Sequence, residues 1–172
     1  MNNIESGKDL LSTAKRIMER DLQEAWEDND DNLVVRRAQE VVELTLKGAL
    51  KFLGVEYPKV HDVGKIFEQT VKRKVSEFDE KVIGKIIRIS ARLAEDRGPS
   101  FYGEIILNRE EAAEAYSDAK FVYNEVIKIL PRVLHENEKG DYVWWINVTF
   151  ARDSIGFVDK FAAHFNIIHH VK

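Results

Sequence analysis

A row of basic residues at helical spacing is the first feature of this sequence that could do chemistry. The basic row consists of Lys81, Lys85, Arg88 and Arg92. Steps of three and four residues place these side chains on one face of a helix. An apolar stripe is displaced from them by one residue, or about 100° of rotation, so the row flanks a buried face. The basic row is either a solvated flank whose alkyl stems cover the core or a surface that faces the phosphates of a nucleotide or RNA.

The sequence also places an imidazole next to a carboxylate, in the pair His61-Asp62. Histidine suits general acid–base catalysis because its charge changes near neutral pH. Neighbouring residues on a helix do not face each other, however. We therefore expect His61 to anchor a loop or cap the start of a helix, and we keep it as a candidate for proton transfer.

Two further groups contain metal-ligand residue types without the arrangement of a metal site. His169 and His170 are neighbours on an expected strand, where adjacent side chains point to opposite faces. Glu111, Glu114 and Asp118 have helical spacing, but the sequence lacks the Glu-x-x-His motifs of a diiron bundle. It also contains no phosphate-binding glycine loop and no cysteine. We predict no metal site and no cofactor.

Apolar residues at three- and four-residue steps predict helices joined by short loops. The expected helices run from about residue 8 to 26, 32 to 53, 61 to 74, 79 to 95 and 109 to 130. Gly54 suits the end of the second helix and Asn108 the start of the last. Gly98 and Pro99 predict a break after Arg97, because proline removes a backbone N–H and clashes with the preceding turn. The sequence thus predicts an all-α protein, an antiparallel up-and-down bundle of four or five helices.

The last forty residues differ in character from the rest of the chain. Residues 142–150 are rich in aromatic and β-branched side chains, which favour a strand. A short helix over residues 153–164 and a second strand over residues 166–171 would complete a small β-α-β extension. We therefore expect a helical bundle over residues 1–131 and an aromatic-rich C-terminal extension over residues 132–172.

Size and charge limit the classes of function. A chain of 172 residues can hold one domain with its own core. Its net charge of −4 argues against broad, non-specific DNA binding. We expect a cytoplasmic location, since no run approaches the ~20 apolar residues of a membrane span and the N-terminus has no signal-peptide pattern. The absence of cysteine, with only three glutamines, favours a thermophilic source.

The segment from Arg37 to Gly64 carries the most specific pattern. An amphipathic helix ends at Gly54, Tyr57-Pro58 forces an extended step, and His61-Asp62 follows at the mouth of the next helix. This order resembles the HEPN family (higher eukaryotes and prokaryotes nucleotide-binding). The resemblance extends over about residues 8–130. It implies a helical bundle that forms a homodimer, binds a nucleotide or RNA, and is paired with a minimal nucleotidyltransferase in a toxin–antitoxin system.

The same resemblance bears on catalysis. RNA-cleaving members of the family carry an Arg-x4-6-His motif, and the matching stretch here is Arg97-x4-Tyr102. A phenol, with an ordinary pKa of about 10, is a poor general base at neutral pH. The resemblance therefore implies that Arg97 binds phosphate and that Tyr102 stacks on or hydrogen-bonds a base, without cleavage. Lys85, Arg88 and Arg92 would be weaker phosphate contacts.

Three functions follow from these observations. The first is a non-catalytic nucleotide- or RNA-binding module that works with a partner protein. The second is a metal-independent RNase that uses Arg97 with Tyr102 or His61. The third is a structural homo-oligomeric protein whose aromatic segment at residues 142–150 docks on another subunit.

Overall fold

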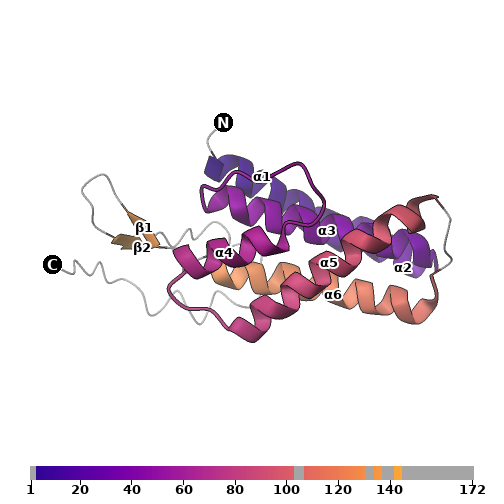
Figure 1. Cartoon of the computed structure of the whole chain (residues 1–172). Helices are drawn as coiled ribbons and strands as arrows, with labels where there is room; N and C mark the ends of the chain where they lie inside the picture. Colours follow the sequence, from indigo (N-terminus) through magenta and orange to yellow (C-terminus); the bar gives the residue numbers. More distant parts are fainter. Residues whose placement is uncertain (1–2, 103–106, 131–133, 137–141, 145–172) are drawn as a thin grey trace, which may run out of the picture.

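The computed structural model describes the backbone of residues 3–102, 107–130, 134–136 and 142–144, and the side chains of residues 3–97 and 107–130. The helices are α1 (Asn3–Arg16), η1 (Ile17–Asp21), α2 (Leu22–Glu27), α3 (Asp31–Phe52), α4 (Gly64–Lys74), α5 (Glu80–Tyr102) and α6 (Arg109–Ile129) (Figure 1). Together they form the predicted all-α bundle.

Two short strands follow the bundle in sequence. Strands β1 (Leu134–Glu136) and β2 (Tyr142–Trp144) pair in antiparallel fashion, with Leu134 opposite Trp144. The start of β2 coincides with the start of the strand predicted at residue 142. The expected helix at 153–164 and the expected strand at 166–171 lie outside the described residues.

The first predicted helix is continuous but contains one wide turn. Segment η1 is π-helical, and the N–H of Leu22 bonds to the carbonyl of Ile17, five residues earlier. That turn accommodates one residue more than an α-helical turn. Leu11 and Ala14 before the turn, and Leu22 and Ala25 after it, are all buried.

Helix α3 lies at the centre of the bundle and packs against α1, α5 and α6. It begins where the side chain of Asp30 accepts a hydrogen bond from the Leu33 N–H at 3.0 Å. It ends before Gly54, whose φ of 71° suits glycine because a Cβ disfavours the left-handed region. Both ends lie where the sequence predicted them.

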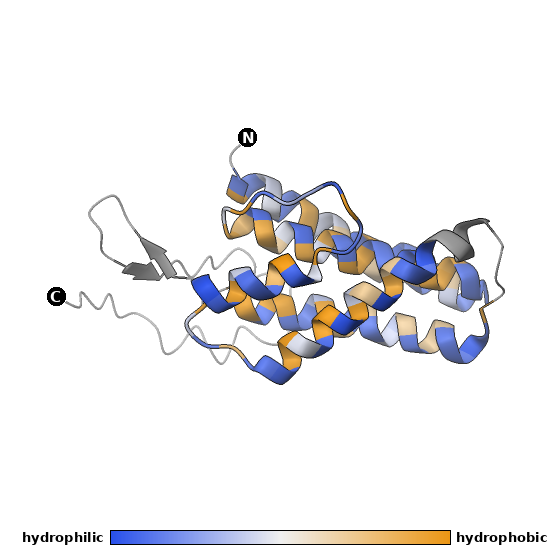
Figure 2. Ribbon diagram, in the orientation of Figure 1, coloured by the Kyte–Doolittle hydropathy of each residue, from blue (hydrophilic) through white to orange (hydrophobic). Residues whose placement is uncertain are grey.

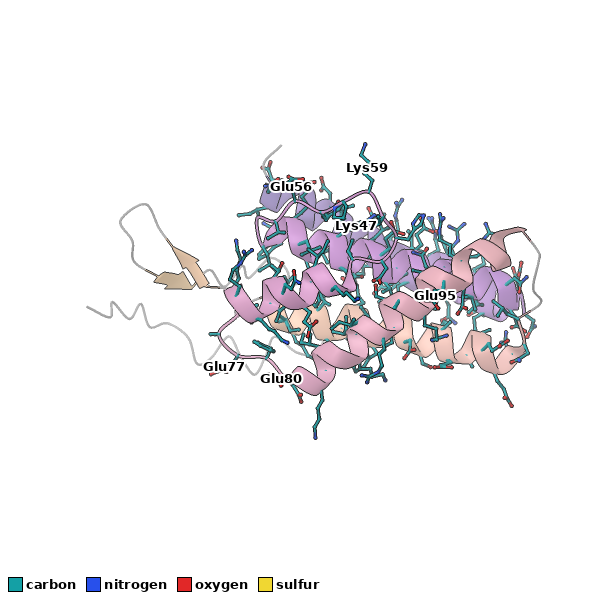
Figure 3. All side chains as sticks on the ribbon, in the orientation of Figure 1. Lys47, Glu56, Lys59, Glu77, Glu80 and Glu95 are labelled. Carbon is teal, nitrogen blue, oxygen red and sulfur yellow. The ribbon has the colours of Figure 1, made fainter. Side chains whose placement is uncertain are left out.

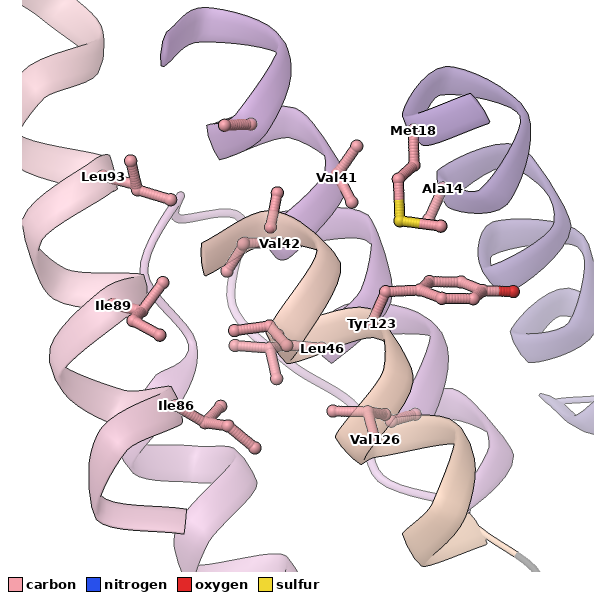
Figure 4. Packing of buried hydrophobic residues seen from close by; sticks show 14 of the residues in the cluster. Ala14, Met18, Val41, Val42, Leu46, Ile86, Ile89, Leu93, Tyr123 and Val126 are labelled. Carbon is pink, nitrogen blue, oxygen red and sulfur yellow. The ribbon is translucent and has the colours of Figure 1, made fainter. Parts of the chain in front are cut away.

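The core forms where the apolar faces of the helices meet. Figure 2 shows that apolar and polar residues alternate around each helix, as an amphipathic bundle requires. Figure 4 shows side chains from α3, α5 and α6 around Leu46, with the Tyr123 ring directed toward Met18. Ile83 of α5 is 1% exposed, although it lies two residues after Lys81 and so outside the predicted stripe, which follows each basic residue by one.

Helix α5 continues through the predicted break. The expectation that Gly98 and Pro99 end the helix is wrong, because helical geometry extends to Tyr102. A proline removes one N–H donor from a helix and introduces a clash, but it does not forbid helical dihedral angles at its own position. Arg97 therefore lies within α5, not in a linker after it.

Helix α6 begins with a reciprocal cap. The Asn108 side chain accepts from the N–H groups of Glu110 and Glu111, and the Glu111 carboxylate accepts from the Asn108 N–H at 2.8 Å.

In the part of the chain that the structure describes, no helix has the length and apolar character that crossing a membrane would require.

Candidate functional site

Arg97 and His61 meet across the bundle although they are far apart in sequence. Nη1 of Arg97, on α5, lies 3.1 Å from Nε2 of His61, in the loop between α3 and α4. The side chain of His61 is 51% exposed. The structure thus brings together two of the three residues that the sequence proposed for catalysis.

Glu43 on α3 holds the other side of the imidazole. Nδ1 of His61 lies 2.9 Å from Oε2 of Glu43. The same oxygen accepts a hydrogen bond from Nε2 of Gln39 at 2.7 Å, and Oε1 accepts from Nζ of Lys47 at 2.6 Å. Gln39, Glu43 and Lys47 are spaced four residues apart, so these three side chains lie along one edge of α3.

Burial and hydrogen bonding act in opposite directions on Glu43. Its side chain is 16% exposed, and burial by itself would raise the pKa of the Glu43 carboxyl. Hydrogen bonds from Lys47, Gln39 and His61 outweigh burial and hold the pKa below its ordinary value. Glu43 is therefore an anion at neutral pH, and it can accept a hydrogen bond from an N–H of the His61 ring.

The direction of each hydrogen bond follows from the donors available. A guanidinium can only donate, so Nε2 of His61 accepts from Arg97. The proton of a neutral imidazole must then reside on Nδ1, which donates to the Glu43 carboxylate. Gln39, Lys47 and His61 all donate to Glu43, and Arg97 donates to His61.

These residues surround a pocket of about 320 Å³. We call it the Arg97 pocket. It is lined by Arg36, Arg37, Gln39, Glu40, Glu43 and Leu44 of α3, His61 of the loop and Arg97 of α5. Its volume is at the lower end of the range for small-molecule sites. Three guanidiniums against two carboxylates give its lining a net positive charge, which suits an anion.

Asp62, the neighbour of His61, fixes the loop that carries the imidazole. Its Oδ1 accepts from the Gly64 N–H at 2.9 Å and from the Ser90 hydroxyl of α5 at 2.7 Å. A Cβ on Gly64 would lie 3.3 Å from the Ile87 Cα, so the loop approaches α5 closely. Asp62 therefore ties the loop to α5, while His61 contacts Glu43 of α3 and faces the Arg97 pocket.

Two members of the basic row contact an acidic residue of α6. Nη2 of Arg92 lies 2.9 Å from Oδ2 of Asp118, and Nζ of Lys85 lies 3.8 Å from Oδ1 of the same carboxylate. Arg88 is exposed and does not line the Arg97 pocket. The structure therefore does not bring Lys85, Arg88 and Arg92 together with Arg97 at this pocket.

Other predicted residues lie partly or wholly outside the part of the chain that the structure describes. Tyr102 is the last residue of α5, and its side chain lies outside the described side chains. His169 and His170 lie outside the described residues altogether. Within the described ranges, no group of three or more His, Cys, Asp or Glu side chains could hold a metal ion.

The sequence analysis missed Glu43 and Gln39 as parts of a site. Glu43 and Lys47 fit an ordinary ion pair one helical turn apart, and nothing local indicates that a distant loop contacts them. A usable signal exists in Gln39, which is polar but falls on the buried side of α3 and is 3% exposed.

Comparison with known proteins identifies the bundle. The HEPN domain model matches residues 6–130. Among solved structures, the crystal structure of an archaeal HEPN homologue has 21% identity and a TM-score of 0.44, over 72% of this chain and 91% of that one. No curated protein matches the chain significantly. The family match includes α3, α5 and the loop that carries His61. The chain therefore belongs to the HEPN family.

Proposed function

We propose that this protein is a nucleotide- or RNA-binding module whose ligand occupies the Arg97 pocket. The supporting observation is the convergence of Arg36, Arg37, Arg97 and His61 on one pocket. Guanidiniums recognise phosphate with paired N–H donors, and such charge-assisted hydrogen bonds are stronger than neutral ones. This ligand chemistry agrees with the family to which the bundle belongs.

The proposal extends to partners. The protein acts in the cytoplasm as a homodimer, together with a minimal nucleotidyltransferase in a toxin–antitoxin pair, as the resemblance to the family implies. Light scattering of the purified chain tests the dimer, for which we expect twice the mass of 19.9 kDa. A monomer at all concentrations would contradict that part of the proposal.

Binding measurements with matched variants test the site. Titration calorimetry with ATP, GTP and short RNAs should detect binding that weakens as salt rises. Arg97→Ala should weaken it by roughly tenfold or more, because a charge-assisted hydrogen bond contributes about 1.5–3 kcal/mol. Lys81→Ala is the control, since it removes one positive charge from the exposed start of the same helix.

Two outcomes would contradict the proposed site. No binding of any of these ligands at low salt would exclude the function itself. Equal weakening by Arg97→Ala and Lys81→Ala would mean that overall charge governs binding and that the Arg97 pocket has no special role.

A second function, metal-independent RNA cleavage, is favoured by the contact between Arg97 and His61. Once a bound phosphate draws Arg97 away from Nε2 of His61, that nitrogen would take the proton of a ribose 2′-hydroxyl, and the 2′-oxygen would attack the adjacent phosphorus. The P–O5′ bond breaks, leaving a 2′,3′-cyclic phosphate and a 5′-oxygen that takes a proton from water. Arg97 would stabilise the charge on the phosphorane. Tyr102 remains the alternative partner of Arg97 in this hypothesis.

Cleavage of labelled RNA in the presence of a chelator separates the two functions. If His61 is the base, His61→Gln abolishes cleavage and leaves binding measurable. Cleavage that persists in Arg97→Ala would identify a contaminating nuclease. Intact RNA at every pH, with binding retained, would leave the binding module as the function.

A further inference from the structure

We propose that the Arg97 pocket binds a terminal phosphate monoester and that His61 takes up one proton when the phosphate binds. The inference rests on the proposed function, because it names the ligand class of the same pocket. The supporting observation is the hydrogen-bond chain from Arg97 through His61 to Glu43. The donors in this chain are assigned because a guanidinium can only donate.

Without a ligand, the neutral imidazole holds Arg97 in place. Nε2 of His61 has one lone pair, and the Nη1 donor of Arg97 occupies it at 3.1 Å. A proton added at Nε2 would remove that lone pair, and two cations would then face each other across the same distance. An anion that accepts from both protonated His61 and Arg97 would hold the two cations together there.

Glu43 can bind both the neutral and the protonated imidazole of His61 through Nδ1. Nδ1 donates to Glu43 in both the neutral and the protonated imidazole, so that contact survives proton uptake and gains opposite charges. The Glu43 carboxylate is already held as an anion by Lys47 and Gln39. Proton uptake by His61 therefore changes only its contact with Arg97 and leaves its hydrogen bond to Glu43 in place.

The charges that face His61 come from three elements. Helix α3 contributes Glu43 by direct contact, Lys47 through Glu43, and Arg36, Arg37 and Glu40 across the pocket. Nη1 of Arg37 lies 2.6 Å from Glu40, so these two charges largely offset each other. Helix α5 contributes Arg97, and the loop contributes Asp62, whose Oδ1 is bound to Ser90 and the Gly64 N–H.

This charge pattern selects the ligand class. A terminal phosphate monoester carries a charge of about −1.5 to −2 near pH 7 and has three free oxygens. It can therefore accept from Arg97 and from protonated His61 at the same time. An internal phosphodiester carries a single negative charge and would leave one of the two cations without an equal partner. Free nucleoside monophosphates and the 5′-phosphate of an RNA share this chemistry.

Titration calorimetry with matched probes tests the inference on the full chain. The probes are AMP, adenosine, and one short RNA with either a 5′-phosphate or a 5′-hydroxyl. Each is measured at about pH 7.5, where the monoester is mostly dianionic, in two buffers of different ionisation enthalpy. We expect AMP and the phosphorylated RNA to bind with uptake of nearly one proton. The 5′-hydroxyl RNA should bind at least about tenfold more weakly.

Two variants connect the proton to His61. His61→Gln keeps an amide N–H for Glu43 and a carbonyl for Arg97 but cannot be protonated, so proton uptake should vanish while weaker binding remains. Glu43→Gln removes the negative charge that favours the imidazolium and should reduce proton uptake. His61 is half-exposed, and an unchanged melting temperature of His61→Gln will show that its fold is intact.

The possible failures are distinguishable. Binding without proton uptake, or equal affinity for the two RNAs, would overturn this inference and leave the proposed function standing. Proton uptake that persists in His61→Gln would also overturn it, because another group would then be the acceptor. Failure of every probe to bind would overturn both. If AMP binds and the phosphorylated RNA does not, the ligand source is a free nucleotide, and the reverse result identifies an RNA end.

Discussion

The guanidinium of Arg92 on α5 lies 2.9 Å from the carboxylate of Asp118 on α6. Asp118 is 8% exposed, although it is charged. A buried carboxylate needs a cation or hydrogen-bond donors to offset its desolvation, and Arg92 and Lys85 supply them from the facing helix. Part of the basic row therefore joins two helices, a role that neither interpretation of the row from the sequence included.

Replacing Asp118 should destabilise the bundle. Asp118→Ala leaves Arg92 without its nearest partner, and we expect the free energy of unfolding to fall by about 1–3 kcal/mol. Chemical denaturation provides the measurement. Glu114→Ala is the matched control, because its side chain is 63% exposed and 3.6 Å from Arg92, and an exposed pair contributes at most about 1 kcal/mol. Equal effects of the two variants would contradict this account.

The contact between α1 and α3 depends on a glycine pair. A Cβ at position 48 would lie 2.8 Å from the Cγ of Leu11 and 3.1 Å from the carbonyl oxygen of Gly7. Gly48→Ala should therefore lower the free energy of unfolding by about 1–3 kcal/mol through overpacking. At Gly84 the nearest atom is Nη1 of Arg88 at 3.6 Å. There Gly84→Ala should stabilise α5 by about 0.5–1 kcal/mol. In thermal melts the melting temperature should therefore fall for Gly48→Ala and rise for Gly84→Ala.

Glu43 should make stability depend on pH in the acid range. Although burial opposes it, hydrogen bonds from Lys47, Gln39 and His61 lower the pKa of Glu43. A carboxyl with a lowered folded-state pKa stabilises the fold above its unfolded pKa, here about 4.5, and loses that contribution as pH falls through the folded-state value. The stability difference between the wild type and Glu43→Gln should thus be largest near neutral pH and shrink below about pH 4.5. A difference that is constant with pH would contradict the shift.

Tyr123 should control stability in the alkaline range. Burial, with a smaller effect of the Glu19 charge, raises the pKa of Tyr123 to about 12. An unfolded phenol loses its proton near ~10, so the stability contribution is full below that pH and is lost as pH rises toward 12. Absorbance at the tyrosinate band should show a transition near pH 12 that is missing from Tyr123→Phe. Titration of all tyrosines near the ordinary value would contradict the burial argument.

Local sequence signals predicted the bundle well because its helices have local causes. Asp30, Gly54 and Asn108 mark helix ends through their own side chains or dihedral freedom, and those boundaries were predicted. The break at Gly98 and Pro99 was not observed, because a propensity is only a local cost that the rest of a long helix can outweigh. The wide turn at η1 has no sequence signature that we recognise.

The site was predictable only in part, because it depends on tertiary contacts. Arg97 and His61 were both named from the sequence, but Arg97 was paired with Tyr102 through a short motif. His61, a partner that the motif did not name, comes from a loop 36 residues away. Glu43 could not be assigned at all, since its link to His61 exists only after the loop folds back over α3. Figure 3 shows this loop, from which Lys59 projects away from the helices.

The wide turn at η1 also absorbs one residue of the first helical rod. Deleting a single residue between Ile17 and Asp21 would let ordinary α-helical winding run without interruption and would keep Gly7 opposite Gly48. Straightening the turn with all its residues kept would instead rotate everything upstream by about 100°, and bulkier neighbours would then enter the narrow gap between the two rods. Relatives of this chain with one residue fewer in that turn should accordingly have an ordinary α-helix there and the same close contact.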